Sequence, residues 1–148
     1  MFKTSVATRV ISFAVLLTFL FASFPTAAGA AKTNNPGLER KWAKLVTLYK
    51  RQSQIHNSAP RWVEWTTNNS SASKSKKAEL WKSLTTSNIA WAPVPSIVMR
   101  HNGFDANGNV VDQAAAQQSV KELSKALQRH TKAIKNLKAL LRQFHLKV

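Results

Sequence analysis

Histidine and glutamate are the residues of this chain whose types could support metal or acid–base chemistry. The four histidines are His56, His101, His130 and His145. No two of them form an HxxxH pair, and the glutamates lack the Glu-x-x-His spacing of helical di-iron sites. The absence of Cys excludes covalent haem attachment and Fe–S clusters of the usual kind, and no glycine-rich phosphate loop occurs. We therefore predict no catalytic residue, no metal, no cofactor and no small-molecule substrate.

One alternative metal site remains open on these residues. His56 and His130 both fall on apolar stripes of expected helices, so the two imidazoles could meet inside a bundle. A hydrogen-bonded core histidine is the commoner outcome at such positions, and the ligand spacing of known zinc sites is missing. The metal-binding bundle is therefore kept as a second alternative function.

The stretch HNGFDANGNVVDQAAA, residues 101–116, resembles a calcium loop at first sight. An EF-hand loop needs oxygen ligands at positions 1, 3 and 5, Gly at position 6 and Glu at position 12. If Asp105 is position 1, Val110 takes the place of the glycine and Ala116 takes the place of the glutamate. The spacing therefore argues against a calcium site at Asp105 and Asp112.

A connector between two helices explains the same stretch better. Gly103 is expected in the left-handed position that ends one helix, and Asn107-Gly108 is expected to reverse the chain. Asp112 is expected to cap the next helix, which opens with Gln-Ala-Ala-Ala. Two or three residues of extended pairing around the reversal remain compatible with this interpretation.

Basic residues of the last helix form the clearest candidate binding site. They occupy heptad positions away from the apolar seam, and only Glu122 offsets their charge. The predicted anion-binding residues are Lys121, Lys125, Arg129, Lys132, Lys135 and Arg142. Lysines on a solvent face can also serve solubility alone, so the charge pattern predicts the electrostatic class of a ligand and not its identity.

The tryptophans divide into two expected groups. Trp42, Trp81 and Trp91 lie on apolar stripes and are expected to fill the core. Trp62 and Trp65, beside Arg61, are expected to form an exposed pair that could stack on a sugar or a base.

Helical periodicity accounts for the elements that hold these side chains. A first helix is expected from Leu38 to about Asn57-Ser58, and a short second helix from Pro60. Residues 68–77 are expected to form a loop, and a third helix is expected over about 76–102 with a kink or break near Ala92.

The last helix has the strongest pattern. Apolar residues alternate in steps of four and three from Ala116 to Val148, and no Gly or Pro interrupts them. We predict an all-α antiparallel bundle of about four helices, with this long C-terminal helix packed on the first and third.

The first thirty residues have the three-part build of a secretory signal peptide. Lys3 and Arg9 precede an apolar run, Pro25 ends the run, and Ala28-Gly29-Ala30 is a small-residue cleavage motif. We expect a cleavable signal peptide at 1–30, a single helical domain at 31–148, and a secreted, periplasmic or extracellular location. Only two of the 22 basic residues and none of the six acidic residues lie in 1–30, so the remaining chain carries a formal net charge of +14.

The segment HNGFDANGNVVD, with the Ala-rich helix start after it and the Leu38-Glu39-Arg40 helix opening, resembles a group of small secreted bacterial proteins. These helical-bundle proteins carry a similar GFDANG-V-D connector before their last helix. The close match covers about a dozen residues, and the chain departs from it in its high Lys content, its tryptophans and the Pro93/Pro95 pair. The resemblance implies the fold and export, and no activity.

These observations lead to one functional hypothesis and its rivals. We expect a secreted, non-enzymatic protein that binds a polyanion, which is envelope polysaccharide, nucleic acid or an anionic membrane surface, through the basic last helix. The first alternative is a structural or protein-interaction module, a homo-oligomer or a partner of another helical protein. It would use the heptad seam at Leu123, Leu127, Leu137 and Leu141.

Overall fold

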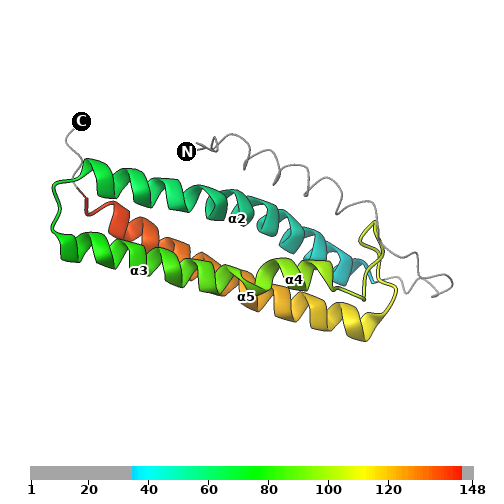
Figure 1. Cartoon of the computed structure of the whole chain (residues 1–148). Helices are drawn as coiled ribbons and strands as arrows, with labels where there is room; N and C mark the ends of the chain where they lie inside the picture. The colour runs from blue at the N-terminus through cyan, green and yellow to red at the C-terminus, as the bar shows by residue number, and fades with distance from the viewer. Residues whose placement is uncertain (1–34, 145–148) are drawn as a thin grey trace, which may run out of the picture. The chain divides into compact units, whose positions relative to one another are not determined.

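The computed structural model describes residues 35–144, and these residues form a bundle of helices (Figure 1). The helices are α2 (Pro36–Asn69), α3 (Lys74–Trp91), α4 (Pro93–Met99) and α5 (Gln113–Leu141). Because α4 continues the line of α3, the described residues make three rods. The α3–α4 rod runs opposite to α2, and α5 runs parallel to α2. The predicted all-α class is confirmed, whereas the predicted signal peptide lies outside the described residues.

The predicted break near Asn57-Ser58 is wrong, because α2 continues through it to Asn69. Pro60 is exposed on the outside of this helix, while Ala59 and Val63 on the other side are fully buried. Burial of that continuous apolar face outweighs the backbone hydrogen bond that Pro60 cannot donate. The two helices expected in this region are therefore one, and the loop expected over 68–77 shrinks to residues 70–73.

The predicted interruption near Ala92 is confirmed. Helix α3 ends at Trp91, and α4 begins at Pro93, the first of the two prolines that cannot donate a backbone hydrogen bond. Helix α4 ends at Met99, three residues earlier than the sequence pattern predicted.

Side-chain caps fix where the long helices begin. The Asn35 side chain accepts a hydrogen bond from the Leu38 amide at 3.2 Å, and Pro36 occupies the first turn of α2. The predicted N-cap of α5 is confirmed, since the Asp112 carboxylate accepts a hydrogen bond from the Ala115 amide at 2.9 Å. Helix α5 ends at Leu141, and residues 142–144 form a turn, so the helix is shorter than the heptad pattern predicted.

The connector between α4 and α5 reverses at Gly108, as expected, with a φ of 83° and a single antiparallel bridge between Phe104 and Val110. The left-handed conformation expected for Gly103 is wrong, because Gly108 is the only described residue with such a φ. Gly103 instead packs directly against the first turn of α5, where any side chain would overlap the backbone of Ala115 and Ala116. Its carbonyl accepts a hydrogen bond from the Val111 amide at 3.0 Å. Close approach, not backbone freedom, is what this glycine provides.

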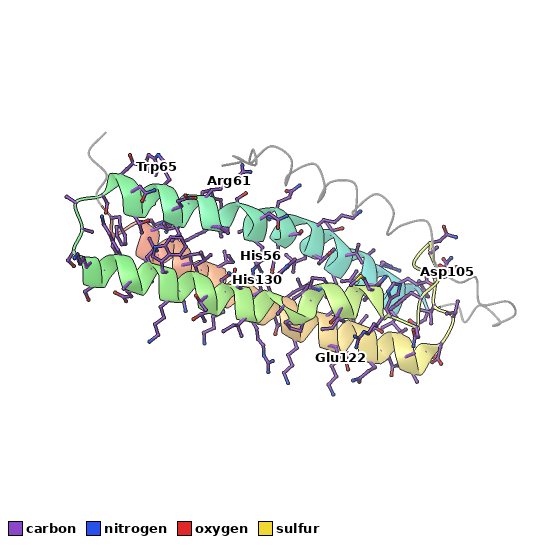
Figure 2. The ribbon with its side chains drawn as sticks, viewed as in Figure 1. His56, Arg61, Trp65, Asp105, Glu122 and His130 are labelled. Carbon is purple, nitrogen blue, oxygen red and sulfur yellow. The ribbon has the colours of Figure 1, made fainter. Side chains whose placement is uncertain are left out.

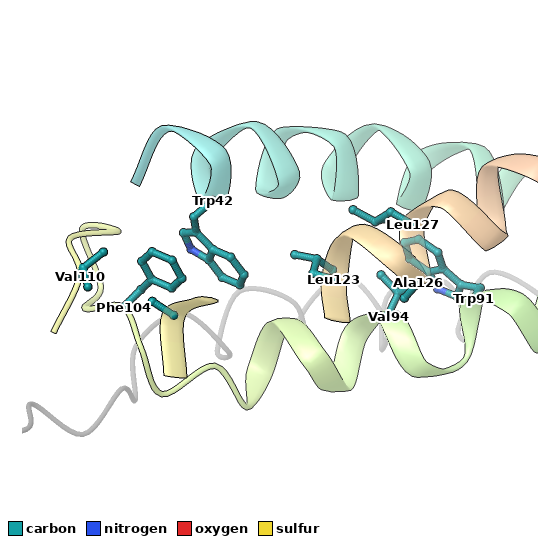
Figure 3. Close-up of a cluster of buried hydrophobic side chains, with 9 residues drawn as sticks. Trp42, Trp91, Val94, Phe104, Val110, Leu123, Ala126 and Leu127 are labelled. Atoms are coloured by element: carbon teal, nitrogen blue, oxygen red, sulfur yellow. The ribbon is translucent and has the colours of Figure 1, made fainter. Parts of the chain in front are cut away.

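Two apolar clusters fill the space between the rods. The cluster beside the connector, shown in Figure 3, stacks Trp42 on Phe104 with ring centroids 4.6 Å apart. Its buried members are Trp42, Trp91, Val94, Phe104, Val110, Ala116, Leu123, Ala126 and Leu127. The cluster at the other end is Ala59, Val63, Leu80, Leu84, Ile134, Leu137 and Phe144. Trp42 and Trp91 are buried as predicted, but Trp81 is 44% exposed, since the core-facing positions of α3 at that level are Leu80 and Leu84.

Candidate anion-binding surface

Helix α5 presents its predicted basic residues to solvent. All six are exposed, five within the helix and Arg142 at its C-cap. The fully buried residues Leu123, Leu127 and Leu137 lie on the opposite side of the same helix and join the core. A 3.6-residue period separates the two sets, so α5 has one cationic face and one core face. We call the six cations the α5 basic face.

Carboxylates near this face are engaged by neutral donors. Glu122, labelled beside α5 in Figure 2, accepts a hydrogen bond from the Gln118 side chain. Glu39 on α2 accepts one from the Val110 amide at 3.2 Å, which ties α2 to the connector. Asp112 is occupied as the cap of α5. A hydrogen bond from a neutral donor leaves the charge of a carboxylate in place. Because Glu122 is the one acidic residue within α5, it offsets only part of the charge of the six cations, and the α5 basic face keeps a positive excess.

Two lysines of α2 extend the cationic surface, and the sequence pattern did not identify them. A groove of about 530 Å³ between α2 and α5 is lined by Lys41 and Lys44 from α2 and by Lys121 and Lys125 from α5. The sequence places Lys41 and Lys44 off the apolar stripe of α2. Their approach to α5 depends on the parallel pairing of the two helices, which no pattern within one helix reveals.

The groove continues toward the start of α2. A second hollow of about 430 Å³ shares Lys41, Val120 and Lys121 with the first. It ends at Asn35 and Gly37 in the first turn of α2. The two hollows are thus adjacent parts of one surface channel, which we call the lysine groove.

The tryptophans of α2 do not form the exposed pair that was expected. Trp65 is 56% exposed, and in Figure 2 it lies with Arg61 on the side of α2 that faces away from the other helices. Trp62 is instead half-buried against the second core cluster, and the Lys138 ammonium lies 5.4 Å from the centre of its ring. This cation–π contact attaches α5 to α2. Lys138 therefore has a structural partner.

A polar layer separates the two apolar clusters. His130, labelled in Figure 2, is fully buried. It forms a 2.6 Å hydrogen bond through Nδ1 with Gln52 Oε1. Gln52 in turn donates to the Leu127 carbonyl at 3.4 Å and to Thr131. Because an amide oxygen only accepts, Nδ1 must carry the proton, which leaves the lone pair on Nε2. That Nε2 atom has no hydrogen-bond partner in the described structure.

Burial disfavours the charged form of both histidines in this layer. Burial, with a smaller contribution from the neighbouring His56, lowers the pKa of His130 to about 4. Burial also lowers the pKa of His56. The two imidazole rings are 5.7 Å apart, and Trp91 packs against both, at 4.7 Å from His130 and 5.0 Å from His56.

The structure thus brings together the two histidines of the metal alternative. Within residues 35–144, however, no three His, Asp or Glu side chains come close enough to share a metal ion. The Asp105 carboxylate accepts hydrogen bonds from the amides of Asn107 at 2.9 Å and Asn109 at 2.8 Å, so it shapes the connector turn.

Comparisons with known proteins leave the chain without an assigned relative. No protein-family model matches the sequence, and neither the curated proteins nor the solved structures contain a significant match. Across residues 35–144, none of the helices combines the length and the apolar character required to span a bilayer.

Proposed function

We propose that this protein is a secreted, non-enzymatic protein that binds anionic surfaces through the α5 basic face. The observation that carries the proposal is the set of six exposed cations along one side of α5, a helix whose one acidic residue is Glu122. Such a surface attracts polyanions over several ångströms and holds them by multiple ion pairs. Export places the surface outside the cytoplasm, where envelope polysaccharide, extracellular nucleic acid and anionic lipid headgroups are the available polyanions.

The interaction-module alternative has less support. It requires the heptad seam to be exposed in the monomer, but Leu123, Leu127 and Leu137 are fully buried in the core of this chain. Leu141 is half-buried against the second core cluster. A partner helix would have to displace α2 or α3 to reach these leucines, at the cost of the core contacts they make.

Retention on immobilised heparin across a salt gradient tests the proposal. We expect the protein to be retained at physiological salt and released only well above it, because each ion pair formed adds to the salt dependence. Sedimentation on the same sample should show a monomer, which would separate surface binding from self-association. Release at low salt by a monodisperse monomer would contradict polyanion binding.

A further inference from the structure

The lysine groove differs from the rest of the cationic surface because it is hollow. Its two sides carry Lys41 and Lys44 from α2 and Lys121 and Lys125 from α5, all four of them exposed. The remaining cations of the α5 basic face line neither hollow. A ligand in the groove would therefore meet cations from two helices at once.

Apolar side chains form the floor between these lysines. Leu45 and Val120 line the larger hollow, and Leu38 and Val120 line the smaller one. All three are half-buried and pack on the first core cluster, so one side of each is fixed and the other faces the groove. Small polar groups, Ser124 and Gln128, complete the lining. The groove thus combines an apolar base with positively charged sides.

We propose that the lysine groove binds an acidic phospholipid, with the acyl chain along the Leu38–Val120–Leu45 floor and the phosphate between the lysines. This inference rests on the proposed function, because Lys121 and Lys125 belong to both the lysine groove and the α5 basic face. It names the class of ligand that the groove binds. Charge complementarity selects the headgroup, since four cations without a carboxylate among the lining residues favour a phosphate. The floor selects the tail, since a fully polar polymer gains nothing from three apolar side chains.

The dimensions of the groove agree with this occupant. Hollows of about 530 and 430 Å³ that share Lys41, Val120 and Lys121 form an open channel in the size range of small-molecule and cofactor sites. An open channel suits a ligand whose headgroup stays in water and whose chain is only partly covered. The site would thus engage lipid at a membrane surface with no helix of residues 35–144 crossing the bilayer.

Binding of residues 31–148, the chain expected after removal of the signal peptide, to lipid vesicles tests the inference with matched variants. The probes are phosphatidylcholine vesicles with and without phosphatidylglycerol, and heparin serves as a polyanion without a tail. The groove variant is Lys41→Gln/Lys44→Gln. The control variant is Lys74→Gln/Lys82→Gln, which removes the same charge from exposed positions of α3 outside the groove. Gln and Lys have similar helix propensity, so both variants should fold.

We expect wild-type protein to bind the phosphatidylglycerol vesicles, and the groove variant to bind them about 25-fold more weakly, at about fivefold for each lysine. The control variant should lose no more than a few-fold. Val120→Thr, which keeps the shape and charge but makes the floor polar, should weaken vesicle binding several-fold and leave heparin retention unchanged.

The contrary outcomes separate the two proposals. Equal losses in the groove and control variants, or vesicle binding by Val120→Thr at the wild-type level, would overturn the groove as a lipid site. Wild-type binding to heparin but not to the acidic vesicles would overturn it too, and would leave polyanion binding intact. Failure of the wild-type protein to bind either probe would remove the proposed function itself.

Discussion

His130 is the residue on which the middle of the bundle depends. Its ring is fully buried between two apolar clusters, oriented by Gln52 and packed against Trp91. A buried imidazole in such surroundings is stable only while it is neutral, because the charged form would lose its hydration without gaining an anionic partner.

Acid should therefore destabilise the fold through this layer. In the folded protein the pKa of His130 is about 4, against an ordinary value of 6.5, so the unfolded chain binds the proton more tightly. The contribution of His130 to stability is complete above about pH 6.5 and is lost as the pH falls toward 4. At about 1.4 kcal/mol per pKa unit, the loss is up to about 3 kcal/mol. Urea unfolding at pH values from 7.5 to 4.5 measures it.

A double substitution isolates this effect from the titration of other groups. Gln52→Leu/His130→Leu replaces both hydrogen-bond partners with apolar groups of similar size, which avoids leaving one of them unsatisfied. We expect the variant to fold and to lose less stability than the wild type between pH 6.5 and 4.5. His56, whose pKa is also lowered, should keep a smaller dependence. Identical pH profiles for the two proteins would contradict the assignment.

Three glycines offer a second test at the scale of single residues. Gly103→Ala should cost more than about 2 kcal/mol, because the new methyl group overlaps the backbone of α5. Gly108→Ala should cost about 1 kcal/mol, the penalty of a left-handed backbone at 83°. Gly37→Ala should be neutral or slightly stabilising, since its methyl group would meet only Asn35 at 3.7 Å. Chemical denaturation ranks the three, and equal effects at Gly103 and Gly37 would contradict the close approach.

Among the elements, α2 is the one whose continuity is least evident from its sequence. Pro60 lies inside the helix, where it removes a backbone hydrogen bond. Pro60→Ala should restore that bond and raise the free energy of unfolding by about 1–3 kcal/mol, with unchanged helix content by circular dichroism. If the substitution lowers stability, Pro60 is acting as the start of a separate helix, and α2 is not continuous.

Local signals in the sequence predicted several features of the elements correctly. Residues close together in the sequence determine the heptad pattern of α5, its Asp112 cap, the Gly108 reversal and the interruption before Pro93. Packing decided the rest. Burial of the apolar face around Val63 keeps α2 helical beyond Pro60, and the orientation of α3 leaves Trp81 exposed to solvent.

The same limit applied to the candidate site. The α5 basic face follows from the period of one helix, and all six predicted cations are exposed. The contribution of Lys41 and Lys44 requires knowing that α2 lies beside α5 in parallel, which depends on long-range contacts. The polar layer has the same origin, because Gln52 and His130 are 78 residues apart in the sequence.

At the scale of the whole molecule, charge dominates the expected behaviour. The chain holds 22 basic and 6 acidic residues, so a strongly basic protein would show some affinity for any polyanion. Binding through the α5 basic face is more specific, because it depends on the positions of the cations on α5 and not on the net charge of the chain. A decisive measurement must therefore compare variants that have the same net charge but have lost their cations at different positions.

Salt-dependent binding to duplex DNA, used as a uniform polyanion, provides that measurement for two variants of equal charge. One replaces the six residues of the α5 basic face with Gln. The other replaces six exposed cations elsewhere, which are Lys50, Arg51, Arg61, Lys74, Lys76 and Lys82. We expect wild-type protein and the second variant to show a slope of log Kd against log salt near 5, at about 0.9 per phosphate contact, and the first variant to lose most of that slope and affinity. Equal losses in the two variants would contradict a dedicated binding face on α5.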